Sequence, residues 1–166
     1  MRPEYLSSLL KASDIDILGL LLDADTKPRS RYGRIRTACL AAFPDLPEEI
    51  PKGGVVAENA GKKRFGVWVM PDNAAEGCLE TFLRHLVPEE SEPLWVHAGN
   101  CSSKAKELGA KWRDVHEPKA KLYTWLAWQD PPGQNPGVAL AKKILDPHSK
   151  EAASFVKWFK ELYKLA

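Results

Sequence analysis

Two stretches of the chain carry the apolar pattern of buried strands. Residues 15–22 (IDILGLLL) begin by alternating apolar and polar positions and end as a continuous apolar run. This pattern is typical of a central strand that is buried on both faces of a parallel sheet. Residues 64–70 (RFGVWVM) form a second buried-strand pattern, and both stretches run into acidic residues. The sequence therefore predicts two buried strands whose carboxyl ends carry acids.

Helical spacing of apolar residues dominates the remaining chain. It predicts a leading helix over residues 1–13 and a second helix from Pro28, which suits a first turn, to about Phe43. Prolines at positions 44, 47 and 51 then exclude regular structure before a short edge strand at 55–56. Further helices are predicted over 75–87, 94–108, 118–129 and 136–145.

The last helix has the clearest amphipathic pattern. Its apolar stripe consists of Ala152, Phe155, Val156, Phe159, Leu162 and Tyr163, and its remaining positions carry Lys157, Lys160, Glu161 and Lys164. Strands alternate with helices in residues 1–87, whereas residues 94–166 are mostly helical. We therefore expect one α/β domain over residues 1–166, in which helices flank a parallel sheet and the C-terminal part forms a helical layer.

Composition narrows the class of protein. The 166 residues carry a formal net charge of +2, with 44% hydrophobic and 28% charged residues, which excludes a disordered tail, a collagen-like chain and a disulfide scaffold. The longest apolar stretch, 18–22, is far shorter than the roughly 20 residues that span a bilayer. The N-terminus also lacks the apolar segment of a signal peptide. We expect a cytoplasmic protein without a membrane span, whose three cysteines are buried small hydrophobes.

Acidic residues follow both predicted strands and form the first candidate site. Asp23 and Asp25 follow one strand, and Asp72 follows the other. Ligands of open parallel sheets bind beyond the carboxyl ends of the strands, so these carboxylates are expected to converge on Mg²⁺ or Mn²⁺, with Glu80 as a fourth ligand. The alternative is that Asp23 and Asp25 cap the next helix and that Asp72 makes a turn.

Basic residues next to these acids form a candidate phosphate site. Lys27, Arg29 and Arg31 begin a run of five cations that contains no acid. Cations are unfavourable at a helix N-terminus unless an anion offsets them, and a bound phosphate would do so. The alternative is a solvated helix face whose arginines pair with carboxylates of the same chain.

Two further patterns have structural and functional interpretations. Residues 118–129 place Leu122, Trp125 and Leu126 on one helical face, which favours a buried helix over an aromatic platform for bases. Lys119 at the start of this helix is a candidate catalytic residue, because it could stabilise charge on a phosphoryl oxygen. A zinc site built from His97, Cys101 and His116 is a minor alternative, since no fourth ligand is evident.

Four motifs resemble an uncharacterised prokaryotic family of unknown function related to the Toprim domain. They are LLLDADT at 20–26, VWVMPDN at 67–73, LETFL at 79–83 and TWLAWQ at 124–129. Toprim domains of topoisomerases, primases and OLD-type nucleases hold magnesium with a first-strand glutamate and a later Asp-x-Asp. The resemblance assigns Asp23 and Asp25 to that Asp-x-Asp, and Glu80 is similar to the later acid of OLD-type domains. The first-strand glutamate is not found, since Glu4 stands in a different context.

The resemblance implies a Toprim-like protein that acts on or binds nucleic-acid phosphodiesters. One expectation is a divalent-metal-dependent nuclease in phage defence or DNA metabolism, with Glu80 and Lys119 as catalytic residues. The other is a catalytically inactive binding or regulatory subunit that works with a partner such as an ATPase, or as a homo-oligomer. Loss of a metal carboxylate would impair two-metal chemistry, which leaves the enzyme assignment open. A haloacid-dehalogenase-type phosphatase and a glycosyltransferase also use Asp-x-Asp and are weaker alternatives.

Overall fold

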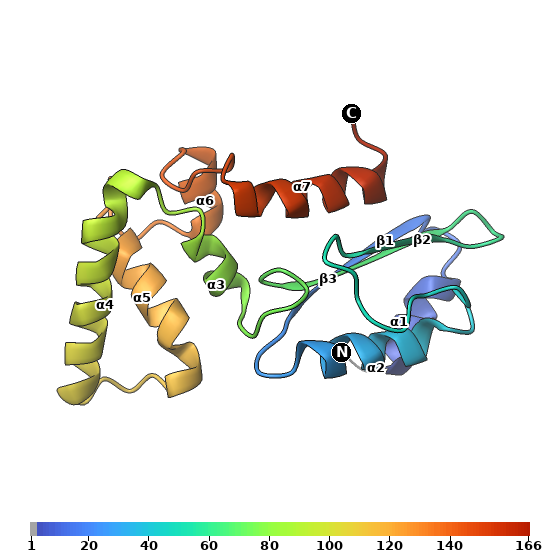
Figure 1. Cartoon of the computed structure of the whole chain (residues 1–166), viewed down its shortest axis with the longest axis horizontal. Coiled ribbons are helices and arrows are strands. Elements are labelled where there is room, and N and C mark those ends of the chain that lie inside the picture. Colours follow the sequence, from blue (N-terminus) through green and yellow to red (C-terminus); the bar gives the residue numbers. More distant parts are fainter. Residues whose placement is uncertain (1–2) are drawn as a thin grey trace. The chain divides into compact units, whose positions relative to one another are not determined.

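The computed structural model describes residues 3–166, which divide into two compact units (Figure 1). The first unit comprises the chain up to Leu79 together with Ala153–Ala166, and the second comprises Glu80–Ala152. The sequence pattern changes near residues 87–94, whereas the structural units separate after Leu79 and the final segment returns to the first unit. None of the described helices is long and apolar enough to cross a membrane.

A three-stranded sheet forms the centre of the first unit. Its strands are β1 (Ile17–Asp23), β2 (Val55–Glu58) and β3 (Arg64–Met70), in the order β1-β3-β2. β1 pairs with β3 in parallel, and β2 pairs with β3 antiparallel. The molecule is thus of mixed α/β class with one parallel strand pair, and the predicted strand at 64–70 is confirmed as the buried central strand.

The prediction that β1 is a central strand is wrong. β1 lies at an edge of the described sheet, and the side chain of Leu21 is 53% exposed. On one face of β1, Leu20 is buried in the hydrophobic core and Leu18 and Leu22 pack against it, whereas Leu21 on the other face is exposed. The apolar run therefore reflects the burial of one face, and it does not report whether both strand edges are paired.

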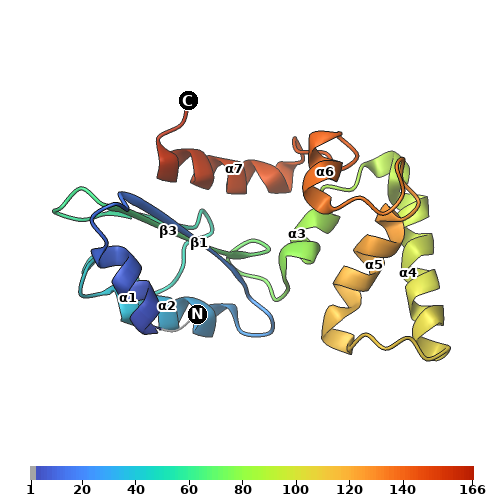
Figure 2. The same ribbon diagram turned by 180° about the vertical axis from the view of Figure 1, so that it is seen from behind.

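Helices α1 (Pro3–Lys11) and α2 (Pro28–Cys39) cover one face of this sheet (Figure 2). The core on this side contains Leu6 and Leu10 of α1, Tyr32, Ile35 and Cys39 of α2, Leu20 of β1, Val55 of β2, and Phe65, Val67 and Val69 of β3. The second helix ends at Cys39, earlier than the predicted Phe43. Phe43 is buried in the core, and it precedes Pro44, which disfavours helical geometry for the residue before it.

The C-terminal part of α7 (Lys150–Tyr163) covers the opposite face of the sheet (Figure 1). Gly19 and Gly66 are register partners on β1 and β3. An added Cβ on either glycine would lie within 3.0 Å of Leu162 Cδ2. The paired glycines therefore let α7 approach the two strands closely.

The predicted apolar stripe of α7 is partly wrong. Trp158, which the stripe omits, is buried, and its indole N–H donates to the Val55 carbonyl oxygen at 2.8 Å. Val156 and Phe159 are instead 41% and 40% exposed. The helix packs through positions 155, 158 and 162, so the two residues lie on the flank of the helix. Apolar residues cover too much of this helix for their spacing alone to select the buried face.

The three cysteines differ in how deeply they are buried. Cys39 is fully buried, as predicted, whereas Cys78 and Cys101 are partly exposed. Burial disfavours the thiolate and raises the pKa of Cys39 to about 11.

This raised pKa predicts a loss of stability in alkali. The unfolded thiol ionises near pH 9 and the folded one near pH 11, so the stabilisation is complete below pH 9 and decreases as the pH rises through 11. Between pH 7 and pH 10, the free energy of unfolding should fall by about 1.4 kcal/mol more in the natural chain than in Cys39→Ala. Urea unfolding at both pH values measures this difference, and parallel pH dependences of the two proteins would contradict it.

The second unit is helical. It contains most of α3 (Leu79–Arg84), together with α4 (Glu92–Glu107), α5 (Glu117–Leu126) and α6 (Pro136–Ala141). Short 3-10 turns at Glu89–Ser91 and Asp114–His116 precede α4 and α5. Trp95 of α4 and Trp125 of α5 pack edge to face, with ring centroids 6.2 Å apart. α3 begins later than the predicted residue 75, because residues 72–78 form a turn in which Gly77 has φ +137°.

Candidate functional site

The carboxyl ends of β1 and β3 lie side by side in the first unit. Asp23 is the register partner of Met70, and the Ala24 N–H donates to the Met70 carbonyl oxygen at 3.1 Å. The parallel pairing thus confirms that two neighbouring strands end at the same edge of the sheet. Asp23 and Asp25 follow one strand end, and Asp72 follows the other.

Asp23 organises the backbone that leads into α3. Its Oδ1 accepts a hydrogen bond from the Leu79 N–H at 2.9 Å, although 56 residues separate the two in sequence. The prediction that Asp23 or Asp25 caps α2 is wrong, since Lys27 is the N-cap residue and no side chain caps that helix. Asp23 therefore retains an exposed carboxylate with one oxygen engaged by a backbone donor.

Asp25 has a left-handed backbone conformation that hydrogen bonds to Gly77 hold in place. Its φ is +51°, a left-handed conformation that aspartate tolerates better than most residues. Two backbone hydrogen bonds of 2.8 Å join Asp25 to Gly77. The Asp25 carboxylate forms an ion pair with Arg31, and both side chains are about half exposed. This pair supports the interpretation in which an arginine of the basic run is neutralised by a carboxylate of the same chain.

Asp72 makes the turn that the alternative interpretation predicted. Its Oδ1 accepts from the N–H groups of Ala74 and Ala75, at 3.0 and 2.7 Å. The neighbouring Asn73 is buried, accepts from the Val69 N–H at 2.8 Å and donates to the Lys52 carbonyl oxygen at 3.0 Å. The sequence predicted a turn at Asp72 and Asn73, but it did not predict that the Asn73 side chain would be buried.

The candidate phosphate residues surround the start of α2. Lys27, Arg29 and Arg31 are all exposed, and the first turn of α2 contains no acidic residue. Arg29 makes only an exposed contact with Glu49, with 3.5 Å between Nη1 and Oε1. Exposed pairs of this kind contribute at most about 1 kcal/mol, so these cations can exchange partners readily.

Glu80 and Lys119 belong to the second unit. Glu80 lies in the first turn of α3 and is mostly buried, and Lys119 Nζ lies 3.9 Å from Glu80 Oε1. Lys119 Nζ also lies 6.0 Å from the centroid of the Tyr123 ring. The predicted site residues thus form two local groups, one around Asp23, Asp25 and the start of α2, and one of Glu80 with Lys119. In residues 3–166, no three His, Cys, Asp or Glu side chains are grouped so that they could hold a metal ion.

The aromatic helix α5 is buried as predicted. Leu122, Trp125 and Leu126 have no exposed surface. Trp128, just after α5, is 41% exposed and stacks on His97 at 5.4 Å between ring centroids. His97 Nε2 lies 3.5 Å from Cys101 Sγ, but His116 instead contacts Arg113, at 3.3 Å. His97 and Cys101 are therefore the two members of the minor zinc alternative that lie together.

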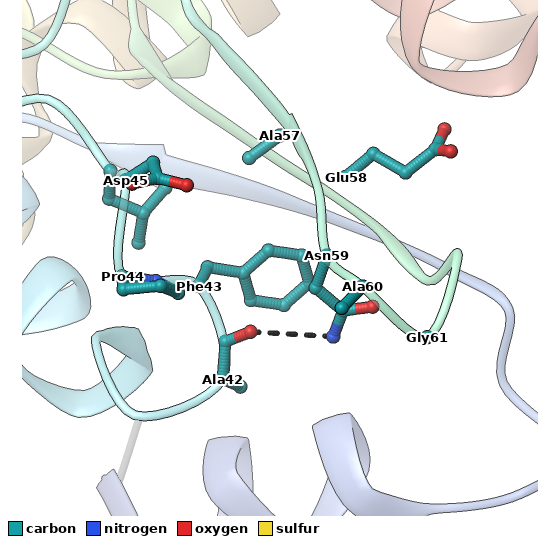
Figure 3. Close-up of a pocket in the computed structure, with 10 residues that line it drawn as sticks. Ala42, Phe43, Pro44, Asp45, Ala57, Glu58, Asn59, Ala60 and Gly61 are labelled. Carbon is teal, nitrogen blue, oxygen red and sulfur yellow. Dashed lines mark hydrogen bonds between the residues drawn. The ribbon is translucent and has the colours of Figure 1, made fainter.

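A pocket of about 280 Å³ lies elsewhere in the first unit, between the segments 42–46 and 57–61 (Figure 3). Asn59 bridges its walls by donating to the Ala42 carbonyl oxygen at 3.3 Å. The Glu58 carboxylate points away from Phe43 in Figure 3 and pairs with Arg64 and Lys164, which lower the pKa of Glu58. The pocket lining thus offers apolar surface together with the polar side chains of Asp45 and Asn59, and it is separate from the predicted site.

Comparisons with known proteins identify a family. No curated protein and no solved structure matches the chain. A family described as "Protein of unknown function (DUF3226)" matches residues 3–164, which is nearly the whole chain. The expectation of an uncharacterised family of unknown function is therefore confirmed, and the chain belongs to the DUF3226 family.

Proposed function

We propose that this chain is a Toprim-related protein that binds nucleic acid through its phosphodiesters at the carboxyl edge of β1. The observation that carries the proposal is the position of Asp23 and Asp25 at that strand end, beside the uncapped first turn of α2 with its exposed Lys27, Arg29 and Arg31. Carboxylate oxygens suit a partly hydrated Mg²⁺ or Mn²⁺, while cations and free helix N–H groups suit phosphate. The neighbouring carboxylates and cations are thus suited to bind a metal ion together with a phosphate group.

The ion pair between Asp25 and Arg31 does not oppose this assignment. Both side chains are about half exposed, so water already screens the pair, and its disruption costs little free energy. A divalent cation on Asp23 and Asp25 would take over the role of the guanidinium, which leaves Arg31 available to a phosphate oxygen. The backbone bridge between Asp25 and Gly77 holds the carboxylate in place during this exchange.

As an enzyme, the chain would be a divalent-metal-dependent nuclease in phage defence or DNA metabolism. Glu80 and Lys119 are its candidate catalytic residues within the second unit, where Lys119 would stabilise charge on a phosphoryl oxygen. The Glu80–Lys119 contact of 3.9 Å brings these two opposite charges together within the second unit, so one contact would position both groups.

A catalytically inactive subunit is the second candidate function. Two of the three strand-end acids already bind backbone groups, and this observation favours it. Asp23 accepts a hydrogen bond from the Leu79 N–H, and Asp72 accepts from the N–H groups of Ala74 and Ala75. Such a subunit would bind nucleic acid without turnover and would work with a partner such as an ATPase.

Metal binding tests the proposal directly. We expect calorimetric titration with Mn²⁺ to give a Kd of roughly millimolar or tighter, the weak end of oxygen-ligand sites, and Asp23→Asn/Asp25→Asn to weaken it at least about tenfold. Asparagine keeps the acceptor for the Leu79 N–H and tolerates the left-handed backbone at position 25. Asp14→Asn/Asp16→Asn is the matched control, because these exposed acids precede β1. Equal affinities of all three proteins would overturn the metal assignment.

The same titration design, with nucleic acid as the ligand, separates the two candidate functions. A labelled single-stranded oligonucleotide should bind the natural chain. Lys27→Gln/Arg29→Gln should make the slope of log affinity against log salt concentration shallower by about 0.7 for each phosphate that the variant no longer neutralises.

A cleavage assay with the same oligonucleotide distinguishes the nuclease from the inactive subunit. Cleavage in Mn²⁺ that disappears in Asp25→Asn supports the nuclease. Binding without cleavage supports the inactive subunit, and the absence of both rejects nucleic acid as the partner.

A further inference from the structure

The outer edge of β1 has none of the features that keep sheet edges from pairing. Exposed edge strands are usually short, bulged, interrupted by proline, or charged. β1 is seven residues long, pairs with β3 in continuous register, and carries neither proline nor a charge from Ile17 to Leu22. Among the described residues, no strand pairs with its outer side. An unprotected apolar edge of this kind is suited to strand addition.

The hydrogen-bonding direction of each β1 residue follows from the ladder. The Asp16 carbonyl accepts from the Arg64 N–H, and the Ala24 N–H donates to Met70, so the even-numbered residues face β3. The backbone groups of Ile17, Gly19 and Leu21 consequently point away from the sheet, because successive residues of a strand direct them to opposite sides. These groups are the donors and acceptors available to an added strand.

Apolar side chains continue the same edge on the α7 face of the sheet. Leu21 is 53% exposed, and α7 adds Val156 and Phe159 at 41% and 40%. The Phe159 ring packs against the Tyr163 ring, and a Cβ added to Gly19 would lie 3.2 Å from the Tyr163 hydroxyl, so these rings lie on the β1 side of α7. The free strand edge and the exposed flank of the helix thus form one surface, which we call the β1–α7 edge.

We propose that the β1–α7 edge binds a second copy of this chain, with the two β1 strands antiparallel about a twofold axis at Leu20. The outward-facing residues then pair in register, since Gly19 lies opposite Leu21 of the second copy and Leu21 lies opposite its Gly19. A symmetric interface uses one surface twice, so the exposed Leu21 of each copy packs beside the Tyr163 and Phe159 rings of the other.

The expected distance between the two α7 helices supports a second copy of the chain as the partner at the β1–α7 edge. Leu162 approaches both Gly19 and Gly66, so α7 lies over the boundary between β1 and β3. Adjacent strands are about 4.8 Å apart, which places the two α7 helices about 10 Å apart across the twofold axis. Helices pack at about 8–10 Å, so the exposed flanks with Val156 and Phe159 would meet at an ordinary packing distance.

The available area is also sufficient for a stable dimer. A seven-residue strand is about 23 Å long, and a sheet with a helical layer on each face is roughly 30 Å deep, which gives about 700 Å² per copy. Specific interfaces bury about 600–1,000 Å² per partner. This proposal does not depend on the proposed function. The pairing places Asp23 opposite Ile17 of the second copy, and it uses the backbone groups of Asp23 rather than its carboxylate.

Sedimentation equilibrium of the full chain at tens of micromolar should give twice the monomer mass. Leu21→Lys places a charge on the edge and should restore the monomer, while Leu165→Lys is the matched control because Leu165 is equally exposed at 53%. Thermal unfolding checks that both variants fold. A monomeric natural chain, or a dimer that Leu21→Lys leaves intact, would overturn the proposal.

Amide hydrogen exchange tests the strand pairing itself. In the dimer, the amides of Gly19 and Leu21 should exchange at least about tenfold more slowly than in the monomeric Leu21→Lys protein. The amides of Leu20 and Leu22 face β3 and should be protected in both proteins. If the chain dimerises but the Gly19 amide exchanges freely, the interface lies elsewhere and the β1–α7 edge is excluded.

Discussion

Replacing Trp158 by alanine should lower the free energy of unfolding by about 3–5 kcal/mol. The side chain is 2% exposed and contacts the sheet through two different interactions. Its ring packs against Trp68 at 5.8 Å between centroids, and its indole N–H donates to the Val55 carbonyl oxygen at 2.8 Å. Alanine would leave a cavity between α7 and the sheet and would remove the side-chain hydrogen bond to the Val55 carbonyl oxygen.

Two neighbouring variants separate packing from hydrogen bonding at this position. Trp158→Phe keeps an aromatic ring and loses the N–H donor, so it should be less damaging than alanine. Phe159→Ala removes an exposed ring from the same helix and should cost less than about 1 kcal/mol in the monomer. Urea unfolding followed by circular dichroism measures all three in the monomeric Leu21→Lys background, because Phe159 lies on the β1–α7 edge. A loss for Trp158→Ala no larger than that for Phe159→Ala would show that α7 does not pack as described.

Gly66→Val should destabilise the chain by about 3 kcal/mol, because there is no space for a side chain on that face of β3. An added Cβ would lie 2.7 Å from Leu162 Cδ2 and 3.0 Å from Trp158 Cζ2. Both neighbours are buried, so neither can move aside freely. Valine would otherwise favour a strand, which makes a large loss of stability diagnostic of the contact with α7.

Gly33→Val is the control for this substitution. Gly33 lies in α2, and a Cβ added there meets nothing within 4 Å. Its replacement should be neutral or slightly stabilising, since glycine is the less favourable residue in a helix. Thermal unfolding distinguishes the two variants, and equal melting temperatures would contradict the close approach of α7 to β3.

The strand ends show how far the candidate site could be predicted. The apolar runs located β1 and β3, and parallel pairing then brought Asp23 next to the end of β3, as expected. The turn made by Asp72 was one of two interpretations that the sequence left open. The hydrogen bond from Leu79 to Asp23 joins residues 56 positions apart, and no local pattern encodes such a contact. The pairing of Arg31 with Asp25 was foreseen only as a general possibility for the basic run.

Local patterns by themselves determined the elements of this protein and their order. Strand runs, helical spacing and prolines act over a few residues, so they fixed the two principal strands, the edge strand β2 and the helices, apart from shifts at their ends. Only the tertiary structure decided that β1 is an edge strand, that Trp158 rather than Val156 faces the sheet, and that the strand-end acids have backbone and arginine partners. Each of these features depends on which distant segments pack together, and periodicity along the chain carries no information about that choice.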